Sequence, residues 1–170
     1  HPTNVDGKAQ TAALVGEKTR HYGHQLAERG FVCLIPDYPS FGEHAYDFDP
    51  KHGYVSGTMK AIWDNIRAVD LLETLTEVDA TRIGVIGHSL GGHNAMFTAV
   101  FEPRLKAIVS SCGFTTFRKD DVPSWTGPRY MPRIKTEFNN DTARVPFDFT
   151  EIVAALAPRP FLTCSATGDS

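Results

Sequence analysis

The chain has 170 residues, of which 41% are hydrophobic and 22% charged, and a formal net charge of −3. This composition is typical of one globular domain with a real core and excludes a disordered or fibrous chain. No basic run could neutralise a phosphate backbone, so nucleic acid is not an expected partner. No apolar stretch is long enough to span a bilayer, so we expect a soluble protein, in the cytoplasm or secreted.

Short runs of apolar residues alternate with helical stretches along the chain, which predicts an α/β fold with a parallel sheet core flanked by helices. The expected strands are 31–36, 82–87, 105–110 and 160–164, and the expected helices are 18–29, 58–75, 92–101 and 151–156. The helix at 58–75 carries a stripe that we assign to the core, with charges on its solvated face. The members of that stripe are Met59, Ile62, Trp63, Ile66, Val69 and Leu72.

The segment 113–150 differs from the rest of the chain because it is aromatic, contains prolines and has no clean periodicity. It interrupts the alternation of strands and helices, so we interpret it as an insertion within a single domain that covers residues 1–170. Its aromatic residues leave the carboxyl end of a strand, where loops commonly carry function. Phe114, Trp125 and Tyr130 are therefore candidate substrate-pocket residues, and packing of the aromatic residues on one another is the equal alternative.

A Gly-x-Ser-x-Gly motif occupies the turn between the expected strand at 82–87 and the helix that follows it. The turn in such a motif is sharp, and glycines two residues before and two after the serine leave room for its backbone. The serine hydroxyl is thereby exposed at the carboxyl edge of the sheet. Ser89 is the predicted nucleophile.

A serine hydroxyl needs a histidine to take its proton and an acid to orient that histidine. In this topology the three residues follow in the order serine, acid, histidine. Asp169 comes just after the last expected strand and is the candidate acid, but all seven histidines precede it. His88 and His93, next to the serine, are expected to pack or to form hydrogen bonds rather than to act as the base.

Taken together, these motifs resemble the α/β-hydrolase superfamily and, within it, the group of dienelactone hydrolases, acetyl-xylan esterases and prolyl-oligopeptidase-like enzymes. The matching segments are Val78–Gly92, Pro36–Gly42, Ala157–Pro160 and Gly168–Asp169. The resemblance implies that Ser89 is the nucleophile and Asp169 the triad acid. It also implies that the turn His1–Pro2 precedes an oxyanion-hole donor, which we assign to the N–H of Thr3, together with the N–H of Leu90.

The match to this group is incomplete at both ends of the chain. His1 stands where the third strand of the fold should end, and Ser170 comes before the eighth strand and the family's histidine. We therefore expect an internal fragment of a longer enzyme whose base histidine lies beyond Ser170. Dienelactone hydrolases proper use a cysteine nucleophile, so the serine here does not favour a dienelactone substrate.

The sequence points to a serine hydrolase that cleaves small carboxylic esters through an acyl-enzyme on Ser89. Two alternatives remain open, namely a peptidase of the prolyl-oligopeptidase type and a non-catalytic binding module that keeps the turn but lacks a base. No cofactor is expected, and the histidine and aspartate cluster at 44–52 has the spacing of no usual metal site. The oligomeric state is left open.

Overall fold

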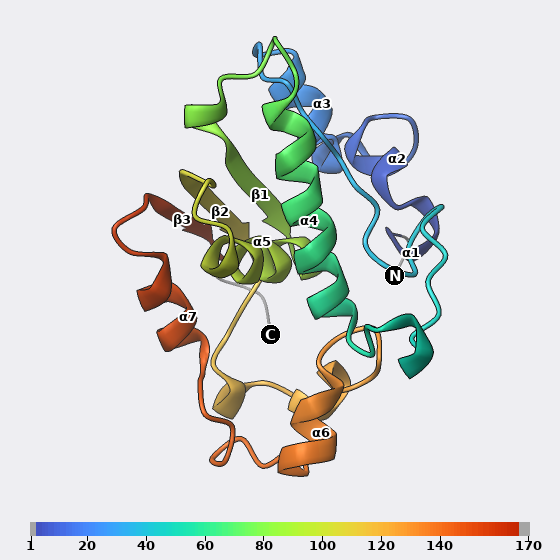
Figure 1. Cartoon of the computed structure of the whole chain (residues 1–170), viewed down its shortest axis with the longest axis vertical. Coiled ribbons are helices and arrows are strands. Elements are labelled where there is room, and N and C mark those ends of the chain that lie inside the picture. Colours follow the sequence, from blue (N-terminus) through green and yellow to red (C-terminus); the bar gives the residue numbers. More distant parts are fainter. Residues whose placement is uncertain (1–2, 167–170) are drawn as a thin grey trace.

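A computed structural model describes residues 3–166, which form a three-stranded parallel sheet with helices on both faces (Figure 1). The strands are β1 (Gly84–His88), β2 (Ala107–Ser111) and β3 (Phe161–Cys164), and β2 lies in the centre. Ile86 is paired with Val109, and Val109 with Leu162. All three strands therefore end at the same edge of the sheet, where the following loops meet.

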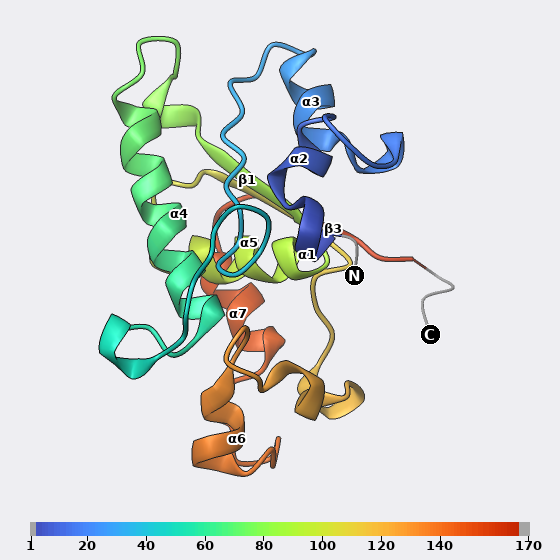
Figure 2. The same ribbon diagram turned by 90° about the vertical axis from the view of Figure 1, so that its right-hand side faces the viewer.

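Most of the helices flank the sheet, and α6 lies away from it, within the segment 113–150 (Figure 1). The helices are α1 (Thr3–Asp6), α2 (Lys8–Thr11), α3 (Tyr22–Ala27), α4 (Gly57–Glu73), α5 (Leu90–Phe101), α6 (Pro132–Phe138) and α7 (Phe149–Leu156). Helix α5 packs on β1 and β2, with α4 and α7 against it. Figure 2 shows α4 on one side of β1, and α2 and α3 on the other. This arrangement confirms the predicted α/β fold with a parallel sheet core flanked by helices.

Local hydrogen bonds explain where α4 and α7 begin. The Ser56 side chain accepts a hydrogen bond from the Met59 N–H and caps α4. At α7, the Asp148 side chain accepts the Phe149 N–H at 2.7 Å, and the Glu151 side chain accepts the Asp148 N–H at 2.8 Å. Such reciprocal caps satisfy donors that the first helical turn leaves unpaired.

The core lies between α5 and its neighbours, and the α4 stripe contributes only part of it. Val69 is buried, and Ile62 and Leu72 pack against the core. Met59 and Trp63, however, are 49% and 44% exposed, so assigning the whole stripe to the core was wrong at its first turns.

Among the described residues, no helix is long and apolar enough to cross a membrane.

The expected strand at 31–36 is extended backbone that forms no β-ladder. A strand needs a neighbour that accepts and donates its backbone hydrogen bonds. None of the strands within residues 3–166 lies in register beside this segment, and Phe31 and Leu34 are 62% and 42% exposed. The expected helix at 18–29 is also divided, into a 3₁₀ turn at Lys18–Arg20 and the shorter α3.

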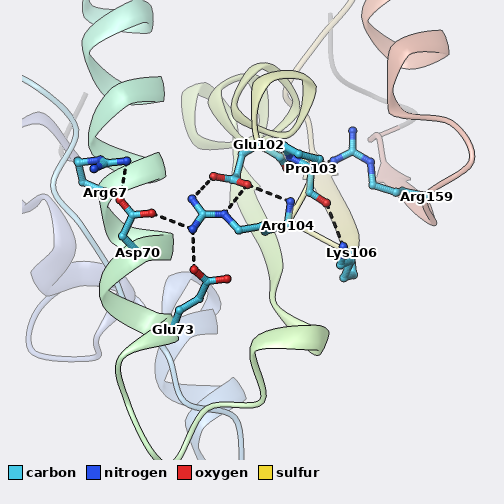
Figure 3. A network of polar contacts seen from close by, with 8 residues as sticks. All are labelled: Arg67, Asp70, Glu73, Glu102, Pro103, Arg104, Lys106 and Arg159. Atoms are coloured by element: carbon cyan, nitrogen blue, oxygen red, sulfur yellow. Dashed lines mark hydrogen bonds and ion pairs between the residues drawn. The ribbon is translucent and has the colours of Figure 1, made fainter.

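A charged network joins the carboxyl ends of α4 and α5 to the start of β2, at the end of the sheet opposite Ser89 (Figure 3). The Arg104 Nε donates to Glu102 Oε1 at 2.8 Å, and its Nη1 lies 2.8 Å from Asp70 Oδ1 and 2.6 Å from Glu73 Oε2. Arg159, before β3, donates to the backbone carbonyl of Glu102 at 3.2 Å. The Glu102 side chain is only 4% exposed, so this pairing holds a nearly buried charge.

Candidate active site

Ser89 occupies the turn between β1 and α5 in a backbone conformation that few residues other than glycine adopt. Its φ is 54° and its ψ −120°, and its side chain is exposed. The Ser89 N–H donates to the Ser111 carbonyl at 2.8 Å, and its own carbonyl accepts the His93 N–H at 3.0 Å. Strain of this kind persists only where surrounding contacts enforce it, and it is common at functional sites. The serine therefore has the geometry expected of a nucleophile elbow.

The glycines of the motif contribute unequally to this turn. A Cβ on Gly87 would lie 2.1 Å from the backbone carbon and oxygen of Gly91, so no side chain fits there. A Cβ on Gly91 itself would meet nothing within 4 Å. Gly92 is the second crowded position, because its Cβ would lie 2.8 Å from the Ser110 Oγ. The expectation that both motif glycines are needed for space is confirmed at Gly87 and wrong at Gly91.

The two predicted oxyanion donors lie on different elements. Leu90 is the first residue of α5, where backbone N–H groups have no carbonyl of the helix to bind and point out of its positive end. Thr3 is the first residue of α1. Its pairing with Leu90 around a shared substrate oxygen stays a prediction.

The histidine before the serine points to the neighbouring strand. The His88 Nδ1 lies 3.2 Å from the Ser111 Oγ, across the β1–β2 pair. Within residues 3–166, no hydrogen bond joins a histidine ring to the Ser89 hydroxyl. His88 therefore has the hydrogen-bonding role that the sequence favoured.

His93 is buried in the core, one turn into α5, and has the packing role expected of it. Its ring stacks on Phe97 at 4.6 Å between centroids and meets Trp125 edge-on at 5.5 Å. Its Nε2 lies 3.5 Å from the Thr58 Oγ1, and its Nδ1 has no partner among the described residues. Burial lowers the pKa of His93 to about 4, so the ring is neutral near pH 7.

The aromatic residues of the 113–150 segment pack on one another behind the turn. Phe114 stacks on Phe149 at 5.5 Å, and Trp125 lies 6.2 Å from Phe117 and 5.9 Å from Phe149. Phe117 and Phe149 are each 2% exposed. Tyr130 is held instead through its backbone carbonyl, which accepts the Ser56 hydroxyl at 2.6 Å. That Phe114, Trp125 and Tyr130 line a substrate pocket stays a prediction.

Asp37 braces the N-terminal segment rather than facing the serine turn. Its carboxylate accepts the Lys8 N–H at 2.6 Å, the Lys8 Nζ at 2.8 Å and the Glu43 N–H at 3.2 Å. Burial alone would raise the pKa of Asp37, but these hydrogen bonds outweigh it and hold the pKa below its ordinary value.

Asp169, the predicted triad acid, lies outside the described residues, as do His1 and Pro2.

Two surface hollows among the described residues have no lining from Ser89. One, of about 820 Å³, is lined by Ser40, Ala45, Tyr46, Asp47 and His52. The other, of about 490 Å³, lies against α1 and α2 beside Asp37. Within residues 3–166 no three His, Cys, Asp or Glu side chains are grouped so that they could hold a metal ion.

Several known proteins similar to this chain are named as hydrolases or esterases. The carbohydrate esterase MZ0003, from an unknown prokaryotic organism, is 28% identical over 175 residues, which cover 90% of this chain and 39% of the relative. The 2,6-dihydropseudooxynicotine hydrolase of Paenarthrobacter nicotinovorans is 49% identical over 130 residues, which cover 71% of this chain and 33% of the relative. A solved glucuronoyl esterase from Solibacter usitatus has a TM-score of 0.57 and 28% identity over 68% of this chain and 32% of its own.

The chain spans about half or less of the length of the curated relatives it matches. The family model described as "Prolyl oligopeptidase family" matches residues 18–170, which is most of the chain and includes the Ser89 turn. Together with the parallel sheet and the strand–serine–helix turn, this match shows that the chain belongs to the prolyl oligopeptidase family, within the α/β-hydrolase superfamily.

Proposed function

We propose that this chain forms the nucleophile-bearing part of a serine hydrolase that cleaves carboxylic esters. One observation carries the proposal, namely an exposed serine with φ 54° and ψ −120° between β1 and α5. The names of the relatives support ester chemistry over peptide cleavage, because they include a carbohydrate esterase and glucuronoyl esterases. The family's name refers to a peptidase, but none of those relatives is named as one.

In the proposed reaction, the Ser89 oxygen attacks the ester carbonyl while a histidine takes its proton. The carbonyl oxygen becomes an oxyanion that accepts hydrogen bonds from the Leu90 and Thr3 N–H groups, each donor being worth roughly a hundred- to a thousand-fold in rate. The alcohol then leaves with the proton from the histidine, and an acyl-enzyme remains on Ser89. Water attacks this ester, the serine regains its proton, and the acid is released.

The proposed base is a histidine outside the described residues, oriented by Asp169. His88 is engaged with Ser111, and His93 is buried with its pKa lowered to about 4, so neither is suited to take the serine proton. This division of roles follows the order serine, acid, histidine of the superfamily.

The proposal is tested with a fluorophosphonate probe, which adds covalently to an activated serine. We expect a single adduct whose peptide maps to Ser89, lost in Ser89→Ala and retained in Ser111→Ala. Hydrolysis of p-nitrophenyl acetate should fall to background in the same Ser89→Ala variant. Labelling that survives in Ser89→Ala would refute the assignment of the nucleophile.

A further inference from the structure

The Asp37 carboxylate joins the first two helices to the loop of residues 37–43, and its side chain is only 5% exposed. One of its oxygens accepts the Lys8 N–H at the start of α2, and the other accepts the Lys8 Nζ and the Glu43 N–H. Burial would raise the pKa of Asp37, but these bonds keep it low, so the carboxylate is charged near pH 7. Hydrogen bonds to a charged acceptor are the stronger kind, and we call this group of bonds the Asp37 anchor.

Two glycines with a positive φ allow the backbone to wrap around this carboxylate. Gly7, between α1 and α2, has a φ of 49°, and Gly42, in the loop, has a φ of 52°. A Cβ on Gly7 would lie 2.1 Å from the Asp37 Oδ1, and a Cβ on Gly42 would lie 2.5 Å from the same atom. The N-terminal segment and the loop therefore meet at the Asp37 oxygens so closely that neither glycine has room for a side chain.

A further hydrogen bond extends this contact to α1, the helix that begins at Thr3. The Gly42 N–H donates to the Asn4 carbonyl at 3.1 Å, so the segment is held at Asn4 and at Lys8, on both sides of Gly7. Helices α1 and α2 have four residues each, which is too short for a helix to be stable through its own hydrogen bonds. The position of the Thr3 N–H therefore depends on the loop that holds these helices.

The loop that carries the carboxylate is itself attached to the rest of the molecule. The Tyr38 hydroxyl donates to the Arg129 carbonyl at 2.8 Å, and the Arg129 Nε donates to the Ser40 Oγ at 2.9 Å. The Gly57 N–H, at the start of α4, donates to the Pro128 carbonyl at 2.8 Å. Helix α4 in turn packs against α5. A continuous series of contacts thus runs from the helix that follows the serine turn, through the loop, to α1.

We propose that Asp37 is a positioning residue for the ester hydrolysis, and that it holds α1 so that the Thr3 N–H and the Leu90 N–H reach the same substrate oxygen. This inference rests on the function proposed for Ser89. Asp37 does not touch the substrate, and it acts through the backbone of α1. Because the oxyanion forms only as the reaction proceeds, a displaced donor slows the chemical step without weakening substrate binding.

The test compares Asp37→Asn with the wild type in the full-length protein. Asparagine has the same shape but no charge, and its NH2 group would face one of the donors from Lys8 or Glu43. We expect the fluorophosphonate to react about ten- to a hundredfold more slowly, with kcat and kcat/KM for p-nitrophenyl acetate lowered by the same factor. The final amount of adduct should stay at one per chain, since a merely structural defect would lower that amount. Asp79→Asn is the matched control, because Asp79 accepts two hydrogen bonds from Thr81 before β1, and it should react at the wild-type rate.

A second pair of variants tests the Asp37 anchor with the carboxylate intact, and it decides if Asp37→Asn loses its native circular dichroism. Gly42→Ala places a Cβ 2.5 Å from the Asp37 Oδ1. Gly53→Ala also puts alanine at a positive φ, of 89°, but its Cβ meets nothing within 4 Å. We expect slow labelling in Gly42→Ala and the wild-type rate in Gly53→Ala, and equal rates in the two would contradict the anchor.

Two results would overturn the proposal, namely a wild-type labelling rate in folded Asp37→Asn, or less adduct formed at an unchanged rate. If the wild type forms no adduct at Ser89, the proposed function fails, and amide hydrogen exchange then tests the Asp37 anchor alone. Asp37→Asn should speed exchange at the Lys8 and Gly42 amides by about tenfold or more and leave the Ser89 and His93 amides unchanged. Unchanged exchange at Lys8 and Gly42 would contradict the anchor.

Discussion

Replacing Gly87 by alanine should disrupt the serine turn, while the same change at Gly91 should not. The new Cβ at residue 87 would lie 2.1 Å from two backbone atoms of Gly91, and no side-chain rotation can relieve that contact. Overpacking costs about 1–3 kcal/mol in general, and contact with backbone on the first turn of α5 places this case at about 3 kcal/mol. At Gly91 the Cβ enters open space, and alanine is favoured over glycine within a helix by about 1 kcal/mol.

Urea unfolding followed by circular dichroism measures both changes. We expect Gly87→Ala to lower the free energy of unfolding by about 3 kcal/mol, which corresponds to a midpoint about 1–3 M lower at the usual urea dependence. Gly91→Ala should leave the midpoint unchanged or raise it. Equal losses in the two variants, or a loss under about 0.5 kcal/mol in Gly87→Ala, would show that the turn is not built as described.

Three further changes probe the packing of the fold, one at the charged network opposite Ser89 and two in the core beside α5. Glu102→Gln removes the nearly buried charge that is paired with Arg104, and we expect the free energy of unfolding in urea to fall by about 1–3 kcal/mol. A loss under about 0.5 kcal/mol would contradict a stabilising role of this pair. The pKa of His93 is about 4 in the native state and about 6.5 in the unfolded state, so the unfolded state binds a proton first as the pH falls. The free energy of unfolding should therefore be highest above pH 6.5 and fall by about 3 kcal/mol toward pH 4. Urea unfolding curves measured across this pH range should show that slope, and His93→Phe should flatten it. Trp125→Ala should cost about 2–4 kcal/mol of stability with unchanged turnover of p-nitrophenyl acetate, whereas lost turnover at unchanged stability would make Trp125 a pocket residue.

Local sequence patterns predicted the strands and the serine turn well. The expected strands at 82–87, 105–110 and 160–164 correspond to β1, β2 and β3, and their ends differ by at most two residues. The turn was recognisable because strand, serine and helix follow each other within a few residues, although the Ser89 N–H is also held by the Ser111 carbonyl of β2. The long helix was predicted at 58–75 and spans Gly57–Glu73.

Features that depend on distant neighbours were not predictable in this way. Residues 31–36 have strand composition, but a ladder also needs a partner that composition does not reveal. His93 was expected to pack or to form hydrogen bonds, but its full burial was not predictable, because residues 92–99 are all buried where α5 packs on the sheet, α4 and α7 together. The hydrogen bonds that fix Arg129 come from residues up to 91 positions away, so no local sequence pattern predicts them.

The most direct test of the proposed nucleophile is the intact mass and peptide map of the protein after treatment with a fluorophosphonate. One phosphonyl group on Ser89, absent from Ser89→Ala and blocked by prior acylation with an ester substrate, is the predicted result. A full-length, folded protein that hydrolyses esters while Ser89 stays unmodified, or whose Ser89→Ala variant retains its turnover, would contradict a serine nucleophile at this turn.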